Sequence, residues 1–166
     1  MTTIALLAFP LGMAFAASSD LLTMRISNKL VLLLVVGFFI LAIATNLPMQ
    51  DFAMHILSAL VVLVVGFTFF AFRWIGGGDA KLAAATTLWL GFGLTVPYLV
   101  YAALFGGVLT LLILAFRGIP LFPMIARFAF LERLHDRKSG VPYGVALALA
   151  GLLTYSNSAI FTSLAT

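Results

Sequence analysis

Long blocks of apolar residues fill most of the chain, and short polar or glycine-containing stretches separate them. A helix of about 20 apolar residues crosses the hydrocarbon core of a bilayer, so each long block is a candidate span. The pattern contains no internal repeat and no stretch typical of a soluble domain. It predicts one all-α, polytopic membrane domain over residues 1–166, with six transmembrane helices. These helices are expected at residues 3–22, 30–45, 52–72, 80–93, 94–116 and 142–161.

The composition supports the same class. Hydrophobic residues make up 64% of the chain, charged residues only 8%, and the mean hydropathy is +1.22. A soluble domain carries about 25% charged residues. The chain has no cysteine, which excludes disulfides, a cysteine nucleophile and a cysteine-ligated zinc site. His55 and His135 have no second ligand at a useful spacing, so neither a metal nor a cofactor is predicted.

The basic residues predict how the chain crosses the membrane. All nine fall in or beside the first, third and fifth connections between the expected spans, and none falls in the second or fourth. By the positive-inside rule these three connections are cytoplasmic, which places both termini on the non-cytoplasmic side. The net charge of +4 is then explained by topology, and no nucleic-acid partner is expected. The basic residues are Arg25, Lys29, Arg73, Lys81, Arg117, Arg127, Arg133, Arg137 and Lys138.

Two expected spans have an alternative interpretation. The first apolar run ends in small residues, as a cleaved secretory signal does, but it lacks basic residues at its start and has them at its end. The span at 80–93 has 14 residues, about 21 Å of helix against a core of about 30 Å. A re-entrant segment would place the last basic connection outside, against the charge rule. We therefore expect a short crossing helix whose glycine-rich start lies at membrane depth.

Two of the five acidic residues stand out because of their positions. Asp20 ends the first apolar block, where a carboxylate opposes the helix dipole. Asp79 follows three glycines and starts the fourth block, where an ordinary N-cap is the alternative explanation. The predicted topology puts both at the cytoplasmic end. Asp51, Glu132 and Asp136 are interpreted as surface charges.

The pairing of Asp20 with Asp79 suggests chemistry. If the first and fourth helices pack together, the two carboxyls can face each other in a partly desolvated site. Such carboxyls do not both ionise cheaply, so one keeps its proton while the other is ionised. Aspartic proteases use this arrangement as an acid and a base, and glycines would let a substrate backbone approach closely. The alternative is two unrelated helix-end carboxylates.

Three motifs resemble those of the type IV prepilin peptidases, which are bacterial intramembrane aspartic peptidases. "DLLTMRISNKL" at 20–30 resembles the segment of the first aspartate, with Ser27 where proline is usual. "GGGDAKLAAA" at 76–85 resembles the Gly-x-Gly-Asp segment, and "GVPYGVALALAG" at 140–151 resembles the start of the last span. Presenilin-like proteases have a tyrosine before the first aspartate, whereas this chain has Ser19.

The resemblance implies that Asp20 and Asp79 form a catalytic pair. The implied activity is removal of the leader peptide from prepilin-like precursors at the cytoplasmic face of the bacterial inner membrane, without a cofactor. The short chain resembles the tight-adherence (Flp pilus) branch, and no separate N-terminal methyltransferase domain is expected. Residues expected to bind substrate or shape the site are Arg25, Asn28, Gly76, Gly77, Gly78, Lys81, Pro142, Tyr143 and Gly144.

The alternative function is a small transporter or channel subunit in which Asp20 and Asp79 bind protons or cations. Their expected place near one face of the membrane, rather than at its midplane, favours the peptidase.

In the last cytoplasmic connection, apolar residues at helical spacing predict a short helix lying in the membrane interface. These are Met124, Ile125, Phe128, Leu131 and Leu134, opposite Arg127 and Arg137.

Overall fold

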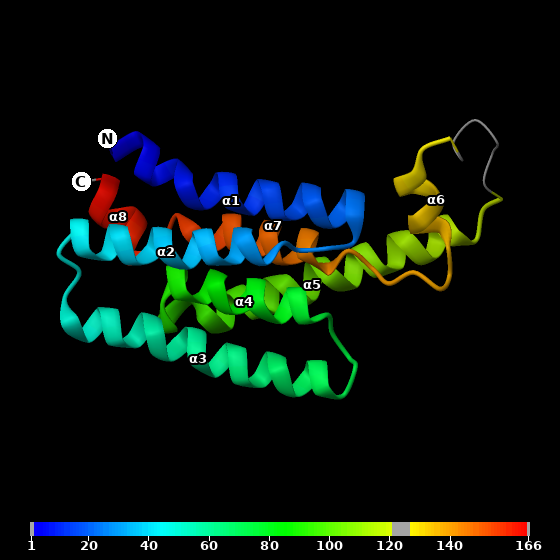
Figure 1. The fold of residues 1–166 in the computed structure, drawn as a ribbon. Coiled ribbons are helices and arrows are strands. Elements are labelled where there is room, and N and C mark those ends of the chain that lie inside the picture. The colour runs from blue at the N-terminus through cyan, green and yellow to red at the C-terminus, as the bar shows by residue number, and fades with distance from the viewer. Residues whose placement is uncertain (1, 121–126, 166) are drawn as a thin grey trace.

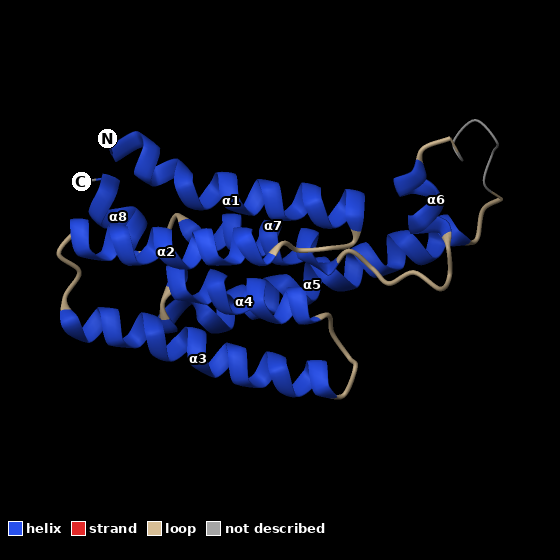
Figure 2. Cartoon of the chain, in the orientation of Figure 1, coloured by secondary structure: helices blue, strands red, loops and turns tan. Residues whose placement is uncertain are grey.

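The protein is an all-helical bundle in a computed structural model that describes residues 2–120 and 127–165. Within these ranges no strand occurs (Figure 2). The all-α prediction is therefore confirmed. The helices are α1 (Thr2–Thr23), α2 (Asn28–Ala44), α3 (Met49–Ala71), α4 (Gly77–Leu90), α5 (Phe92–Arg117), α6 (Ala129–His135), α7 (Tyr143–Tyr155) and α8 (Ala159–Ala165).

The six main helices, α1 to α5 and α7, alternate in direction along the bundle, as Figure 1 shows. Helices α1, α3 and α5 run one way along the bundle, and α2, α4 and α7 run back. The α1–α2, α3–α4 and α5–α7 connections therefore share one end of the bundle. All the basic residues lie in or next to these three connections. We call this end of the molecule the basic end.

Among the described residues, three helices are long and apolar enough to cross a membrane: α1, through Leu6–Thr23, α3 and α5. Helices α2 and α7 are shorter apolar helices. A chain with this set of apolar helices is a multi-pass membrane protein. The count of six spans and the side on which the termini lie stay predictions.

The sixth expected span, 142–161, is wrong as one continuous helix. It is divided into α7 and α8 by a turn at residues 156–158. The hydroxyl of Ser158 accepts a hydrogen bond from the backbone N–H of Phe161 at 3.2 Å. Serine and asparagine side chains compete with the helix for backbone groups, so the "SNS" sequence ends α7 and caps α8.

Helix α4 lies in the centre of the bundle. Ten of its 14 residues are buried, and it packs chiefly against α3, α7 and α2. Trp89, near its end, lies against the rings of Phe9 and Phe38 and donates its indole N–H to the carbonyl of Leu34 at 2.9 Å. The core of the molecule is thus built around the helix that begins with the glycine run.

Side chains of α3 satisfy the end of α4 inside the bundle. The last carbonyls of a helix have no intrahelical donor. Here Ser58 Oγ donates to Thr87 O at 2.9 Å, and His55 Nδ1 donates to Leu88 O at 2.7 Å. Gly91, at a φ of +79°, lets α5 begin at the next residue. These bonds explain how a helix of 14 residues can end within an apolar environment.

The predicted interfacial helix is described only in part, because Met124 and Ile125 lie outside the described residues. Its second half forms α6. Arg133 donates to the carbonyl of Leu22 at 2.7 Å, and His135 Nε2 donates to the carbonyl of Ile119 at 2.8 Å. Helix α6 is therefore attached to the last residues of α1 and to the chain just after α5.

Candidate active site

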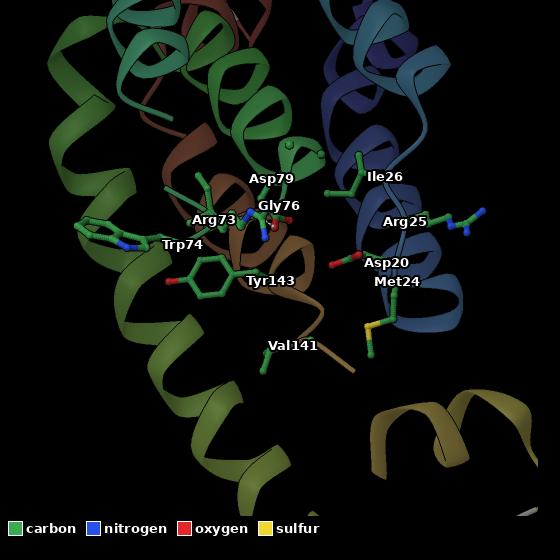
Figure 3. Close-up of a pocket in the computed structure, with 14 residues that line it drawn as sticks. Asp20, Met24, Arg25, Ile26, Arg73, Trp74, Gly76, Asp79, Val141 and Tyr143 are labelled. Carbon is green, nitrogen blue, oxygen red and sulfur yellow. Dashed lines mark hydrogen bonds between the residues drawn. The ribbon is translucent and has the colours of Figure 1, made fainter. Parts of the chain in front are cut away.

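A cavity of about 930 Å³ opens at the basic end of the bundle. Its wall comes from the end of α1, the α1–α2 loop, the glycine run at the start of α4, and the residues around the start of α7 (Figure 3). The two aspartates singled out by sequence both line it. The full lining is Asp20, Met24, Arg25, Ile26, Arg73, Trp74, Ile75, Gly76, Gly77, Gly78, Asp79, Gly140, Val141 and Tyr143.

Asp20 is held by the first turn of α7. Its side chain projects from α1 into the cavity (Figure 3), yet the residue is only 5% exposed. Its Oδ2 atom accepts the backbone N–H of Gly144 at 2.7 Å. The first N–H groups of a helix lack intrahelical partners and favour a carboxylate. This contact accounts for an acidic residue that the dipole of its own helix would disfavour.

Gly144 is a position where a side chain would not fit. A Cβ atom added there would lie 2.8 Å from Asp20 Oδ2 and 2.9 Å from Ile26 Cδ1. The close approach of α7 to Asp20 therefore requires glycine. The motif "VPYG" thus supplies both the start of α7 and the donor for one aspartate.

Asp79 is inside α4 rather than at its N-cap. Gly76 is the N-cap residue and Asp79 the third residue of the helix. Its Oδ2 atom accepts the backbone N–H of Gly76 at 3.2 Å, as the acidic member of a capping box does. Within the described residues, each aspartate thus hydrogen-bonds a backbone amide through Oδ2. The Oδ1 atoms of Asp20 and Asp79 make no hydrogen bond there, so both have an oxygen for water or substrate.

Ile26 packs between α4, which carries Asp79, and α7, whose Gly144 amide holds Asp20. An added Cβ at Gly78 would lie 3.2 Å from the Cβ of Ile26, and one at Gly144 would meet its Cδ1. Gly78 directly precedes Asp79, and Gly144 binds Asp20. A single side chain in the α1–α2 loop therefore spaces α4 and α7 at the level of the aspartates.

Five of the other nine predicted site residues line the cavity, and Asn28, Lys81, Pro142 and Gly144 do not. Arg25, Tyr143 and the three glycines 76–78 line it. Lys81 and Asn28 are outside the lining and bind each other, with Lys81 Nζ donating to Asn28 Oδ1 at 3.1 Å. Pro142 is the buried N-cap residue of α7. Seven further lining residues were not predicted from the sequence, although all of them lie within or beside the three motifs: Met24, Ile26, Arg73, Trp74, Ile75, Gly140 and Val141.

A second cavity of about 500 Å³ adjoins the first. It lies among α3, α4, α5 and α7, and apolar side chains form nearly all of its wall. Ile75, Asp79 and Tyr143 line both cavities. Asp79 thus lies between the first cavity, whose lining includes charged residues, and a second cavity that is almost entirely apolar.

Tyr143 lies at the junction of the two cavities. Its hydroxyl donates to the carbonyl of Ala102 on α5 at 3.2 Å. Gly106, one turn further along α5, leaves the space that the tyrosine ring occupies. The ring is therefore held by α5 while its backbone starts α7.

The described residues offer no cluster of three or more His, Cys, Asp or Glu side chains for a metal ion. Two carboxyl groups, those of Asp20 and Asp79, line the cavity, and Arg25 and Arg73 also belong to its lining. Two carboxyls in one open cavity can supply an acid and a base for hydrolysis.

The fold and the cavity define a multi-pass helical membrane protein with a pair of carboxyl groups at one end of its bundle. Residues 7–111 match the type IV leader peptidase family, and the chain belongs to this family. The matched region contains the motifs of Asp20 and Asp79 and ends before α7. No match was found among curated proteins or among solved structures. The family resemblance is confirmed, and the protein is a peptidase of the prepilin leader type; the Flp branch stays a prediction.

Proposed function

We propose that the protein is an aspartic endopeptidase that removes the leader peptide of prepilin-like precursors, with Asp20 and Asp79 as its catalytic pair. The observation that carries the proposal is that both carboxyls line one open cavity although they come from helices distant in sequence. Membership of the type IV leader peptidase family supports the substrate class. The proposed setting is the bacterial inner membrane, with six spans and the basic end facing the cytoplasm.

The proposed reaction begins with one ionised and one protonated aspartate. The carboxylate takes a proton from water, and the water oxygen forms a bond to the carbon of the scissile carbonyl. The other aspartate gives its proton to the carbonyl oxygen, which yields a neutral tetrahedral diol. The first aspartate then passes its proton to the leaving nitrogen while the second takes one from a hydroxyl, and the C–N bond breaks. Both aspartates return to their starting forms.

The backbone around the pair suits an extended peptide. The three glycines 76–78 line the cavity without side chains, so a substrate backbone can approach Asp79 closely. The hydrogen bonds donated by the backbone N–H groups of Gly144 and Gly76 fix one oxygen of each aspartate. Groups fixed in this way before the substrate binds lose little further freedom in the reaction.

Co-expression with a small pilin-like precursor encoded beside the gene tests the proposal. The wild type should shorten the precursor by its leader, measured by intact mass. Asp20→Asn and Asp79→Asn keep the side-chain shape but remove the acid–base group, so each should abolish cleavage. Asp51→Asn is the matched control because Asp51 is exposed in the first turn of α3, at the other end of the bundle. Cleavage that survives either site substitution would refute the pair.

A further inference from the structure

Arg117, the last residue of α5, holds the chain that leads from α6 back to the cavity. Its half-buried guanidinium makes three hydrogen bonds, all to backbone carbonyls. Nε donates to Leu134 O at 2.7 Å, and Nη2 donates to Ser139 O at 3.0 Å and Gly140 O at 2.8 Å. This is a larger set of contacts than a residue that only set topology would need.

The backbone between Gly140, whose carbonyl accepts from Arg117, and Gly144, whose N–H donates to Asp20, is short and stiff. Gly140, whose carbonyl binds Arg117, is followed by Val141, and both line the cavity. Pro142 has φ −72° and ψ 78°, and the N–H of Tyr143 donates to Val141 O at 2.8 Å. These are the features of an inverse γ-turn, with φ fixed by the proline ring. The next residue is Gly144, which donates to Asp20.

We propose that Arg117 is a positioning residue that holds the turn at 140–143, and through it the Gly144 amide, in place against Asp20. The inference rests on the proposed function, because it assigns Arg117 to the geometry of the same pair. Arg117 touches neither aspartate, and it acts through four residues of backbone. The contact also gives the connection between α5 and α7 a role: its final residues form one wall of the cavity.

The arginine guanidinium carries several N–H donors in a fixed planar arrangement, so the role of Arg117 can be tested with Arg117→Lys, which keeps the positive charge. A lysine at 117 keeps the positive charge and the attachment to the membrane interface, but one ammonium cannot reproduce donors spread over Nε and Nη2. Arg137→Lys is the matched control, because Arg137 is exposed in the same connection and its side chain makes no hydrogen bond to any described residue.

The experiment compares wild type, Arg117→Lys and Arg137→Lys, purified in lipid nanodiscs, in cleavage of the precursor. A small displacement of a catalytic group costs roughly 10- to 100-fold in rate, so kcat of Arg117→Lys should fall by that factor while KM stays within about twofold. Hydrogen exchange should speed up over residues 141–147 in Arg117→Lys alone. Arg137→Lys should match the wild type in both measurements.

The measurements separate a failure of the proposed function from a failure of the positioning role of Arg117. If the wild type cleaves nothing, the proposed function fails and the inference with it. If the wild type cleaves and Arg117→Lys keeps its kcat, or slows only through a higher KM, the positioning role alone is wrong. Unchanged exchange over 141–147 also overturns it. Should Arg117→Lys not accumulate as folded protein, Pro142→Ala loosens the same turn with the arginine intact, and a wild-type kcat in that variant would overturn the inference.

Discussion

The backbone N–H of Gly144 donates to Oδ2 of Asp20 across 2.7 Å, and this bond joins the first turn of α7 to the last turns of α1. The two residues are far apart in sequence, and the bond forms only because position 144 has no side chain. The start of α7 is therefore part of the candidate active site rather than only its neighbour.

Gly144→Ala should abolish or strongly reduce leader cleavage. The added Cβ would lie 2.8 Å from Asp20 Oδ2 and 3.0 Å from Asp20 Cβ, so either α7 or the carboxyl must move. A shift of this kind costs roughly 100-fold in rate. The measurement is kcat for cleavage of the precursor, on protein shown to be folded by size-exclusion chromatography.

Gly93→Ala is the control for that substitution, because a Cβ at Gly93 in α5 meets nothing within 4 Å. It should leave cleavage unchanged. A Gly144→Ala variant as fast as Gly93→Ala would mean that the Gly144 amide does not position Asp20.

His55→Ala should destabilise the bundle with little direct effect on chemistry. The change removes the donor to Leu88 O at the buried end of α4, and a buried carbonyl left without a partner costs about 1–3 kcal/mol. The expected result is a lower melting temperature in detergent, measured by intrinsic fluorescence. Ser18→Ala is a control of a different kind, since Ser18 is exposed and bonds only within its own helix. Equal melting temperatures for His55→Ala and wild type would contradict the capping role.

Much of the fold could be predicted because apolar periodicity is a local signal. The blocks at 3–22, 30–45, 52–72, 80–93 and 94–116 correspond to α1 to α5 within a few residues. The apolar run at 142–161 did not predict the break between α7 and α8, which falls at the Ser-Asn-Ser cluster within it. Such clusters mark turns, so the signal was present in the sequence.

The aspartates could be selected because a carboxylate at the edge of an apolar block is costly and calls for an explanation. What holds them could not be predicted. The bonds from Gly144 to Asp20 and from Arg117 to Gly140 join residues that the fold brings together, and no periodic pattern encodes such contacts. Three successive glycines also gave no way to decide which of them caps α4, and hence whether Asp79 lay before or inside the helix.

Lys81 and Asn28 should act as one unit, and their loss should affect cleavage less than loss of the aspartates. Lys81 Nζ donates to Asn28 Oδ1 at 3.1 Å, which links α4 to α2 outside the cavity. Lys81→Met and Asn28→Ala each remove the same bond, so the double variant should lose no more activity than the more affected single variant. Kinetics of the two single variants and the double variant measure this coupling. Fold-losses that multiply would show that the two residues act separately, and complete inactivity of Lys81→Met would place it in the reaction.

Gly106 and Gly107 are adjacent on α5 and offer a matched test of Tyr143. An added Cβ at Gly106 would overlap the Tyr143 ring, whereas one at Gly107 meets nothing within 4 Å. Gly106→Ala should displace the ring from the junction of the two cavities and break its bond to Ala102 O. Overpacking of this kind costs about 1–3 kcal/mol, so we expect both a lower melting temperature and slower cleavage. Gly107→Ala should keep wild-type activity and gain slightly in stability, since alanine suits a helix interior better than glycine. If the two alanine variants behave alike, the tyrosine ring does not shape the site.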